Sequence, residues 1–171
     1  IRDRQEEKLV TFSEEPRPMG RPAKMWALTR AANRFFPDGN AELLVNMIDL
    51  VRQVHGEDGL GDLIRARADE QFERYRERLQ KADSLHGKLE VLAEIRTEEG
   101  YMAEVREAED GGYLLIENHC PICEAAETCQ KFCSDELGLF QRLLSEEAEV
   151  LRTEHMLQGS RRCVYRVRTA G

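Results

Sequence analysis

The five cysteines of the chain are unevenly placed, and four of them lie between residues 120 and 133. Cys120 and Cys123 form a Cys-x2-Cys pair, a spacing that lets two thiolates face one ion. Thiolates select zinc, copper(I) or iron–sulfur clusters over magnesium and calcium. The spacing fits neither a zinc ribbon nor a ferredoxin closely, so it predicts a soft metal and leaves iron–sulfur and zinc open. The candidate metal ligands are Cys120, Cys123, Cys129, Cys133 and Cys163.

Two histidines extend this candidate site. His119 directly precedes Cys120, and His155 is expected on a strand that faces the strand of Cys163. The side chains of His155 and Cys163 could then point at one ion. A histidine beside a cysteine site can also be an outer partner that orients a ligand, so ligand and partner remain alternatives for His119 and His155.

Composition predicts a folded protein that works away from membranes. The chain is 41% hydrophobic and 34% charged, which is typical of globular rather than disordered proteins. It has no apolar run of the ~20 residues that a membrane span needs, and no signal peptide opens it. We therefore expect a cytoplasmic protein. In a reducing cytosol, clustered cysteines favour metal binding over structural disulfides.

Residues 16–34 carry basic side chains and no acidic ones, although the net charge of the chain is −8. The proline-punctuated start of this segment separates strand-like residues 9–12 and 25–29, with Trp26 expected in the core beneath. A helix end is expected at residues 1–8, so the order is helix, strand, basic loop and strand, as in the second half of a winged helix. The first half of such a domain is missing, which predicts that the chain is a fragment of a longer protein. An ordinary solvated turn is the alternative. The residues expected to contact DNA are Arg17, Arg21 and Lys24.

Helical periodicity dominates the next part of the chain. The apolar stripe of residues 43–54 predicts either an internal helix face or, in a DNA-binding regulator, contact with a twofold mate. Glycines at residues 56–59 are expected to break the helical run. The apolar stripe expected to face inward on the following helix is Leu60, Leu63, Ile64, Phe72, Tyr75 and Leu79. The expected helices span residues 29–36, 41–55, 60–79 and 84–97.

From Gly100 the period changes to that of strands. Residues 101–108 and 113–117 flank a strong hairpin signal, and a helix is expected at 134–145. A closing hairpin is expected from residues 150–156 and 163–167. If their segment is helical, Cys129 and Cys133 lie one above the other. The sequence thus predicts an α+β protein with three regions: a wing (1–36), a helical linker and dimerisation region (37–82), and a sensor of antiparallel sheet and helix that carries the thiols (83–171).

Three segments, residues 15–26, 117–123 and 152–163, resemble the Suf-operon repressor (SufR) family of iron–sulfur-sensing winged-helix regulators, of the DeoR/ArsR type. The resemblance implies that Cys120 and Cys133, which keep that family's spacing, hold a cluster together with Cys163. Cys123 and Cys129 are additional to the family's three-cysteine pattern. The C-terminal hairpin also resembles 4-vinyl-reductase-type sensor domains, some of which hold zinc.

The resemblance implies a homodimeric transcriptional repressor that binds an operator in double-stranded DNA and senses a 4Fe–4S cluster. The alternative is a zinc-stabilised regulator that binds a small organic ligand. A redox enzyme with a dithiol of Cys123 and Cys129 is a third hypothesis. The sequence has no phosphate-binding loop, nucleophile–base pair or open catalytic metal site, so no enzymatic activity is expected.

Overall fold

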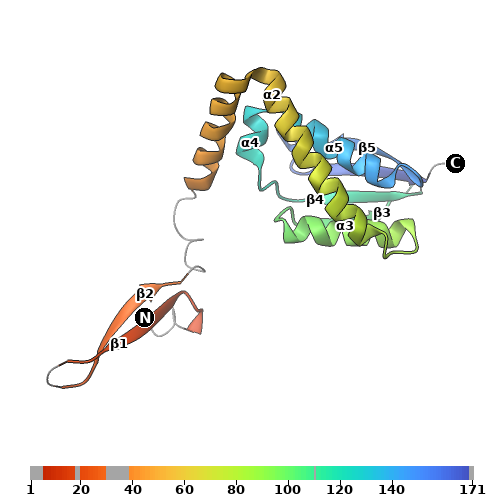
Figure 1. The fold of residues 1–171 in the computed structure, drawn as a ribbon. Coiled ribbons are helices and arrows are strands. Elements are labelled where there is room, and N and C mark those ends of the chain that lie inside the picture. Colours follow the sequence, from red (N-terminus) through yellow and green to blue (C-terminus); the bar gives the residue numbers. More distant parts are fainter. Residues whose placement is uncertain (1–5, 18–19, 30–38, 110, 170–171) are drawn as a thin grey trace. The chain divides into compact units, whose positions relative to one another are not determined.

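The structure is a computed structural model of the chain, and it describes residues 6–17, 20–29, 39–109 and 111–169 (Figure 1). Its contacts divide the chain into two compact units, residues 1–40 and 41–171. The second unit combines helices with an antiparallel sheet, so the α+β class expected from the sequence is confirmed.

The N-terminal unit contains an antiparallel hairpin of β1 (Val10–Glu15) and β2 (Ala23–Leu28). Thr29 closes the open end of this hairpin. Its backbone N–H donates to the carbonyl of Leu9 at 3.0 Å, and its hydroxyl donates to the carbonyl of Lys8 at 2.6 Å. The predicted order of strand, basic loop and strand is therefore present.

Trp26 does not lie in a core beneath the hairpin. Its side chain is 39% exposed and packs beside Phe12 on the neighbouring strand, with 5.1 Å between ring centroids. A two-stranded hairpin alone has no second layer that could cover an indole. The expectation of a core position for Trp26 was wrong. Of the helix expected at residues 29–36, only Thr29 lies within the described residues, and residues 1–5 of the helix expected at 1–8 also lie outside them.

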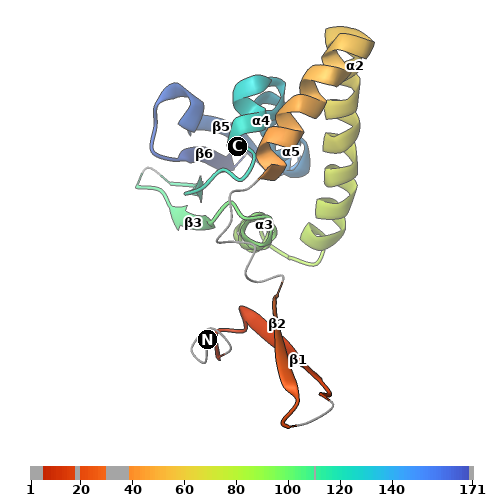
Figure 2. The ribbon, with the colours of Figure 1, turned by 90° about the vertical axis from the view of Figure 1, so that its left-hand side faces the viewer.

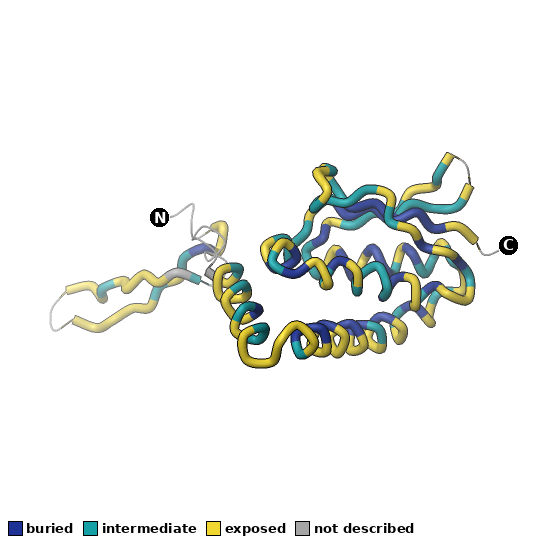
Figure 3. The backbone as a smooth tube through the Cα atoms, turned by 90° about the horizontal axis from the view of Figure 1, so that it is seen from above, coloured by how far each residue is buried: buried dark blue, intermediate teal, exposed yellow. Residues whose placement is uncertain are grey.

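The C-terminal unit has three layers (Figures 2 and 3). A four-stranded antiparallel sheet of order β3-β4-β6-β5 forms the first layer, and α3 and α5 cover one of its faces. The second half of α2 packs outside these two helices. The elements after α2 are α3 (Leu85–Glu98), β3 (Ala103–Glu107), β4 (Tyr113–Glu117), α4 (Cys123–Thr128), α5 (Lys131–Leu144), β5 (Ala148–Glu154), the 3-10 turn η2 (Met156–Gln158) and β6 (Cys163–Thr169).

Helix α2 (Gly39–Leu79) consists of two segments that meet at a kink. Gly56 has φ 74° and ψ −179°, a backbone conformation that is almost confined to glycine. The break expected over residues 56–59 is therefore limited to one residue. We call residues 41–55 the arm, since they precede this kink.

The core lies between the sheet and the helices, and α2 contributes to it through Tyr75 and Leu79. Helix α3 begins where the sequence predicts, because the backbone N–H of Gly87 donates to the N-cap hydroxyl of Ser84 at 3.1 Å. Leu63 departs from the predicted inward stripe of α2, since its side chain is exposed. The other members of that stripe are buried or half-buried.

The cysteine segment is more helical than expected. The sequence did not predict α4, and α5 begins at Lys131 rather than at residue 134. The strand expected over residues 150–156 starts at Ala148 and ends at Glu154. His155 therefore follows the strand rather than lying within it.

Candidate metal centre

Four different elements position the five cysteines, all of which are free thiols. Cys120 lies in the loop between β4 and α4, Cys123 begins α4, and Cys129 follows the end of α4. Cys133 lies in the first turn of α5, and Cys163 is the first residue of β6. The cysteines thus come from segments that are far apart in the sequence.

Cys120, Cys133 and Cys163 are electrostatic neighbours, with Cys123 beside the first of them. Burial raises the pKa of Cys120 to about 12, and negative charge on Glu136, Cys123 and Cys133 adds to the shift. Burial also raises the pKa of Cys133 to about 11, with contributions from Glu136 and Cys163. Cys120 acts on the pKa of Cys123, and the thiol of Cys123 donates to Glu127 at 3.9 Å. The thiols of Cys120 and Cys133 are therefore protonated at neutral pH as the chain stands.

Cys129 belongs to a different neighbourhood. It ends α4 with extended backbone angles (φ −146°, ψ 104°), so it does not lie above Cys133 on one helix as the sequence suggested. Its buried side chain packs in an apolar cluster with Ile48 and Leu60 of α2 and Ala125 of α4. The structure thus separates Cys129 from the other four thiols.

The two candidate histidines lie at the edge of the thiol group. His119 is exposed and directly precedes Cys120. His155 directly precedes η2 and lies outside the strand ladder, so it does not face Cys163 across paired strands as expected. Its Nε2 lies 3.4 Å from a guanidinium nitrogen of Arg152, and burial together with the charge of Arg152 lowers the pKa of His155.

Arg152 is a member of the site that the sequence gave no reason to select. It comes from β5, and its positive charge lowers the pKa of both Cys133 and Cys163, opposing the effect of burial. A guanidinium in this place would stabilise thiolates, which are the form in which cysteine binds metals.

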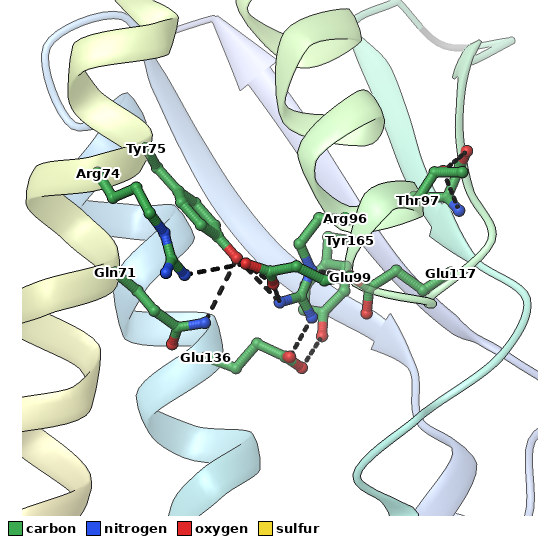
Figure 4. Close-up of polar contacts among 10 residues, drawn as sticks. Gln71, Arg74, Tyr75, Arg96, Thr97, Glu99, Glu117, Glu136 and Tyr165 are labelled. Carbon is green, nitrogen blue, oxygen red and sulfur yellow. Dashed lines mark hydrogen bonds and ion pairs between the residues drawn. The ribbon is translucent and has the colours of Figure 1, made fainter. Parts of the chain in front are cut away.

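A buried ionic network, drawn in Figure 4, was also missed. It adjoins the thiols, because the charge of its member Glu136 raises the pKa of Cys120 and Cys133. Its centre is Arg96 of α3, which is 1% exposed. The Arg96 Nε donates to Glu117 of β4 at 2.6 Å, and a second guanidinium nitrogen pairs with Glu136 of α5. The guanidinium also stacks on the ring of Tyr101 at 3.4 Å from its centroid. Burial raises the pKa of Glu117 to about 7, against the effect of Arg96.

The same network reaches α2 and β6. The Tyr75 hydroxyl donates to Glu99, and the Arg96 guanidinium lies 3.5 Å from that hydroxyl. Tyr165 of β6 donates to Glu136 at 2.9 Å. Burial raises the pKa of Tyr75 to about 12, so this hydroxyl remains a donor. The guanidinium of Arg96 on α3 therefore connects α2, β4 and α5 directly, and β6 through Glu136.

No group of three or more His, Cys, Asp or Glu side chains in the described ranges is already arranged to hold a metal ion. The donor chemistry nevertheless suits a soft metal, because three neighbouring thiols with a fourth beside them are the ligands that iron–sulfur clusters and zinc require. A metal would have to draw these thiols closer together and release their protons.

The three basic residues of the hairpin lie at or near its loop. Arg17 and Arg21 are exposed in the loop itself. Lys24 lies at the start of β2, where it is opposite Glu14 in the strand register, and its Nζ is 3.9 Å from the centroid of the Phe12 ring. The two arginines are therefore better placed than Lys24 to reach a polyanion.

Comparison of the sequence with known protein families and with curated proteins gave no match. Among the described residues, no helix combines the length and the apolar character that crossing a membrane requires.

Proposed function

We propose that the protein is a cytoplasmic, homodimeric DNA-binding repressor whose operator affinity is controlled by a 4Fe–4S cluster. The closeness of Cys120, Cys133 and Cys163 carries this proposal. These thiols come from a loop, a helix and a strand, so a cluster bound to all three would join those elements. The cluster would supply a group that forms and is lost with the state of iron and oxygen in the cell. The thiols would hold it, and Arg152 would stabilise their negative charge.

The exposed hairpin supports the proposed binding of DNA. Arg17 and Arg21 present guanidinium groups on a loop between two short strands, a shape that suits contacts with the phosphate backbone or the minor groove. The chain is acidic as a whole, so an acidic surface elsewhere would keep other faces away from DNA.

The arm supports the proposed homodimer. Four of its apolar residues recur at alternating spacings of four and three, and each is half exposed or more: Leu43, Met47, Leu50 and Val54. This is the spacing that two helices of a coiled coil use along the seam where they pair. The positions that flank the seam carry no charge, since they are Leu44, Asn46, Val51 and Gln53. A second copy of the arm can therefore pair with the first without like charges meeting.

Operator binding by metal-loaded and metal-free protein tests this function. DNA sites would be selected from a random pool by the full-length protein, and affinities measured anaerobically by gel shift at one fixed salt concentration. We expect the two forms to differ by roughly 5-fold to 150-fold, the usual range of allosteric coupling. Equal affinities of the two forms would contradict the proposal.

Replacing Arg21 by alanine tests the hairpin. We expect several-fold weaker binding to every sequence and a salt dependence that is shallower by about one unit of slope, because a phosphate contact is lost. Arg76→Ala is the matched control, since Arg76 is exposed on α2 and pairs with Glu73. If both variants bind like the unaltered protein, the hairpin does not contact DNA.

A zinc-stabilised ligand sensor is the second candidate, and one observation favours it. An apolar groove of about 270 Å³ lies between the arm, the second segment of α2 and the cysteine segment, with Met47, Leu63, Ile122 and Phe132 in its lining. A small apolar molecule could bind there while zinc on the thiols stabilises the fold. Metal analysis distinguishes the two candidates.

A further inference from the structure

The arm joins the rest of its unit at the Gly56 kink, here called the hinge, and through a small set of side-chain contacts. The backbone conformation of Gly56 is almost confined to glycine, so the glycine permits the kink at this position. Side-chain contacts beyond the hinge then hold the arm in its observed direction.

The apolar half of these contacts centres on Ile48. This residue is 5% exposed, although the other large apolar side chains of the arm are mostly exposed. It packs with Leu60 and Ile64 beyond the kink, and with Ala125 and Cys129 of the cysteine segment. Cys129 therefore acts as a packing residue at this joint.

The polar half centres on Arg52. One guanidinium nitrogen donates to the backbone carbonyl of Thr128 at 3.2 Å, and the Nε donates to Glu57 at 2.5 Å, across the hinge. From the cysteine segment, Lys131 donates to the backbone carbonyl of Glu57 at 3.1 Å. The last residue of α4 and a residue that follows it thus contact both sides of the kink.

Helix α4 is short enough to transmit a movement from one end to the other. Cys123, next to the thiol group, begins it, and Cys129, in contact with the arm, follows its last residue. We infer that α4 is a lever: when the thiols of Cys120, Cys123 and Cys133 close on a metal, α4 is drawn away from Ile48 and Arg52 and releases the arm. The inference rests on the proposed function for its metal step, and it assigns the regulation of that function to one contact.

The contact itself can be tested in metal-free protein by amide hydrogen exchange of residues 41–55. We expect Ile48→Ala to speed exchange by roughly tenfold or more, because a buried side chain that anchors the arm is lost. Arg52→Ala should act in the same direction with a smaller effect. Arg65→Ala is the control, since Arg65 is an exposed α2 residue paired only locally with Asp62, and it should change exchange less than twofold. Unaltered exchange in Ile48→Ala would overturn the inference.

The metal step is tested by the same measurement on protein loaded anaerobically with iron and sulfide, with iron assayed in each sample. We expect faster exchange of residues 41–55 in the loaded protein, and a smaller metal response in Ile48→Ala at equal iron content. Full iron content with unchanged or slower exchange would overturn the lever while leaving the cluster in place. Failure to take up iron would remove the proposed function, and the lever's metal step with it.

Discussion

Replacing Arg96 by methionine is expected to lower the free energy of unfolding of the C-terminal unit by about 3–5 kcal/mol. The guanidinium is the cation shared by Glu117 and Glu136, both of which are mostly or fully buried. Methionine retains much of the side-chain volume but leaves those carboxylates without a counter-charge. Protonation of the carboxylates relieves this cost, so the loss should shrink as the pH falls.

Urea unfolding followed by far-ultraviolet circular dichroism measures this loss. The single tryptophan, Trp26, lies in the hairpin and thus in the other compact unit. Arg78→Ala is the matched control, because Arg78 forms a two-bond ion pair with Glu98 at the surface, where such pairs contribute about 0–1 kcal/mol. Adding Glu117→Gln to the Arg96→Met variant should recover part of the loss. An Arg96→Met loss no larger than that of Arg78→Ala would show that the network is not structural.

Replacing Cys133 by serine is expected to abolish iron binding and the visible absorption of the loaded protein. Negative charge on Cys133 raises the pKa of Cys120, and negative charge on Cys163 raises the pKa of Cys133. Cys133 is therefore a neighbour of both other members of the group. A hydroxyl is a poor ligand for a soft metal and cannot replace it. Iron, sulfide and absorption would be measured on protein loaded anaerobically.

Cys129→Ser is the matched control for this experiment. Its thiol packs against Ile48 and Leu60 rather than against the other thiols, so the variant should keep its iron. Cys123→Ser should lose part of it, because Cys123 lies beside Cys120 and is placed to be the fourth ligand. Loss of iron in Cys129→Ser with normal iron in Cys133→Ser would contradict the assignment of the thiols.

Much of the fold follows from local patterns in the sequence. The Ser84 cap and the apolar spacing of Leu89, Leu92 and Ile95 predict α3, and the glycines at residues 111–112 predict the turn between β3 and β4. These features depend on residues close together in the chain. Local propensity and periodicity therefore suffice to find them.

The parts that the sequence could not reveal depend on contacts between distant elements. Arg96 and Glu117 look like surface charges in a chain rich in both types, and only the packing of α3 against β4 buries them together. Helix α4 has six residues, too few to show a helical period. Cys129 lies four residues before Cys133, a spacing that suits two ligands on one helix. The backbone is extended at Cys129, however, and its side chain packs against Ile48 of the arm.

The metal content of protein purified without oxygen tests the central claim most directly. We predict about four iron and four sulfide per chain, the composition of a 4Fe–4S cluster, with broad visible absorption. A colourless protein with one tightly bound zinc per chain, or with no metal, would contradict the claim.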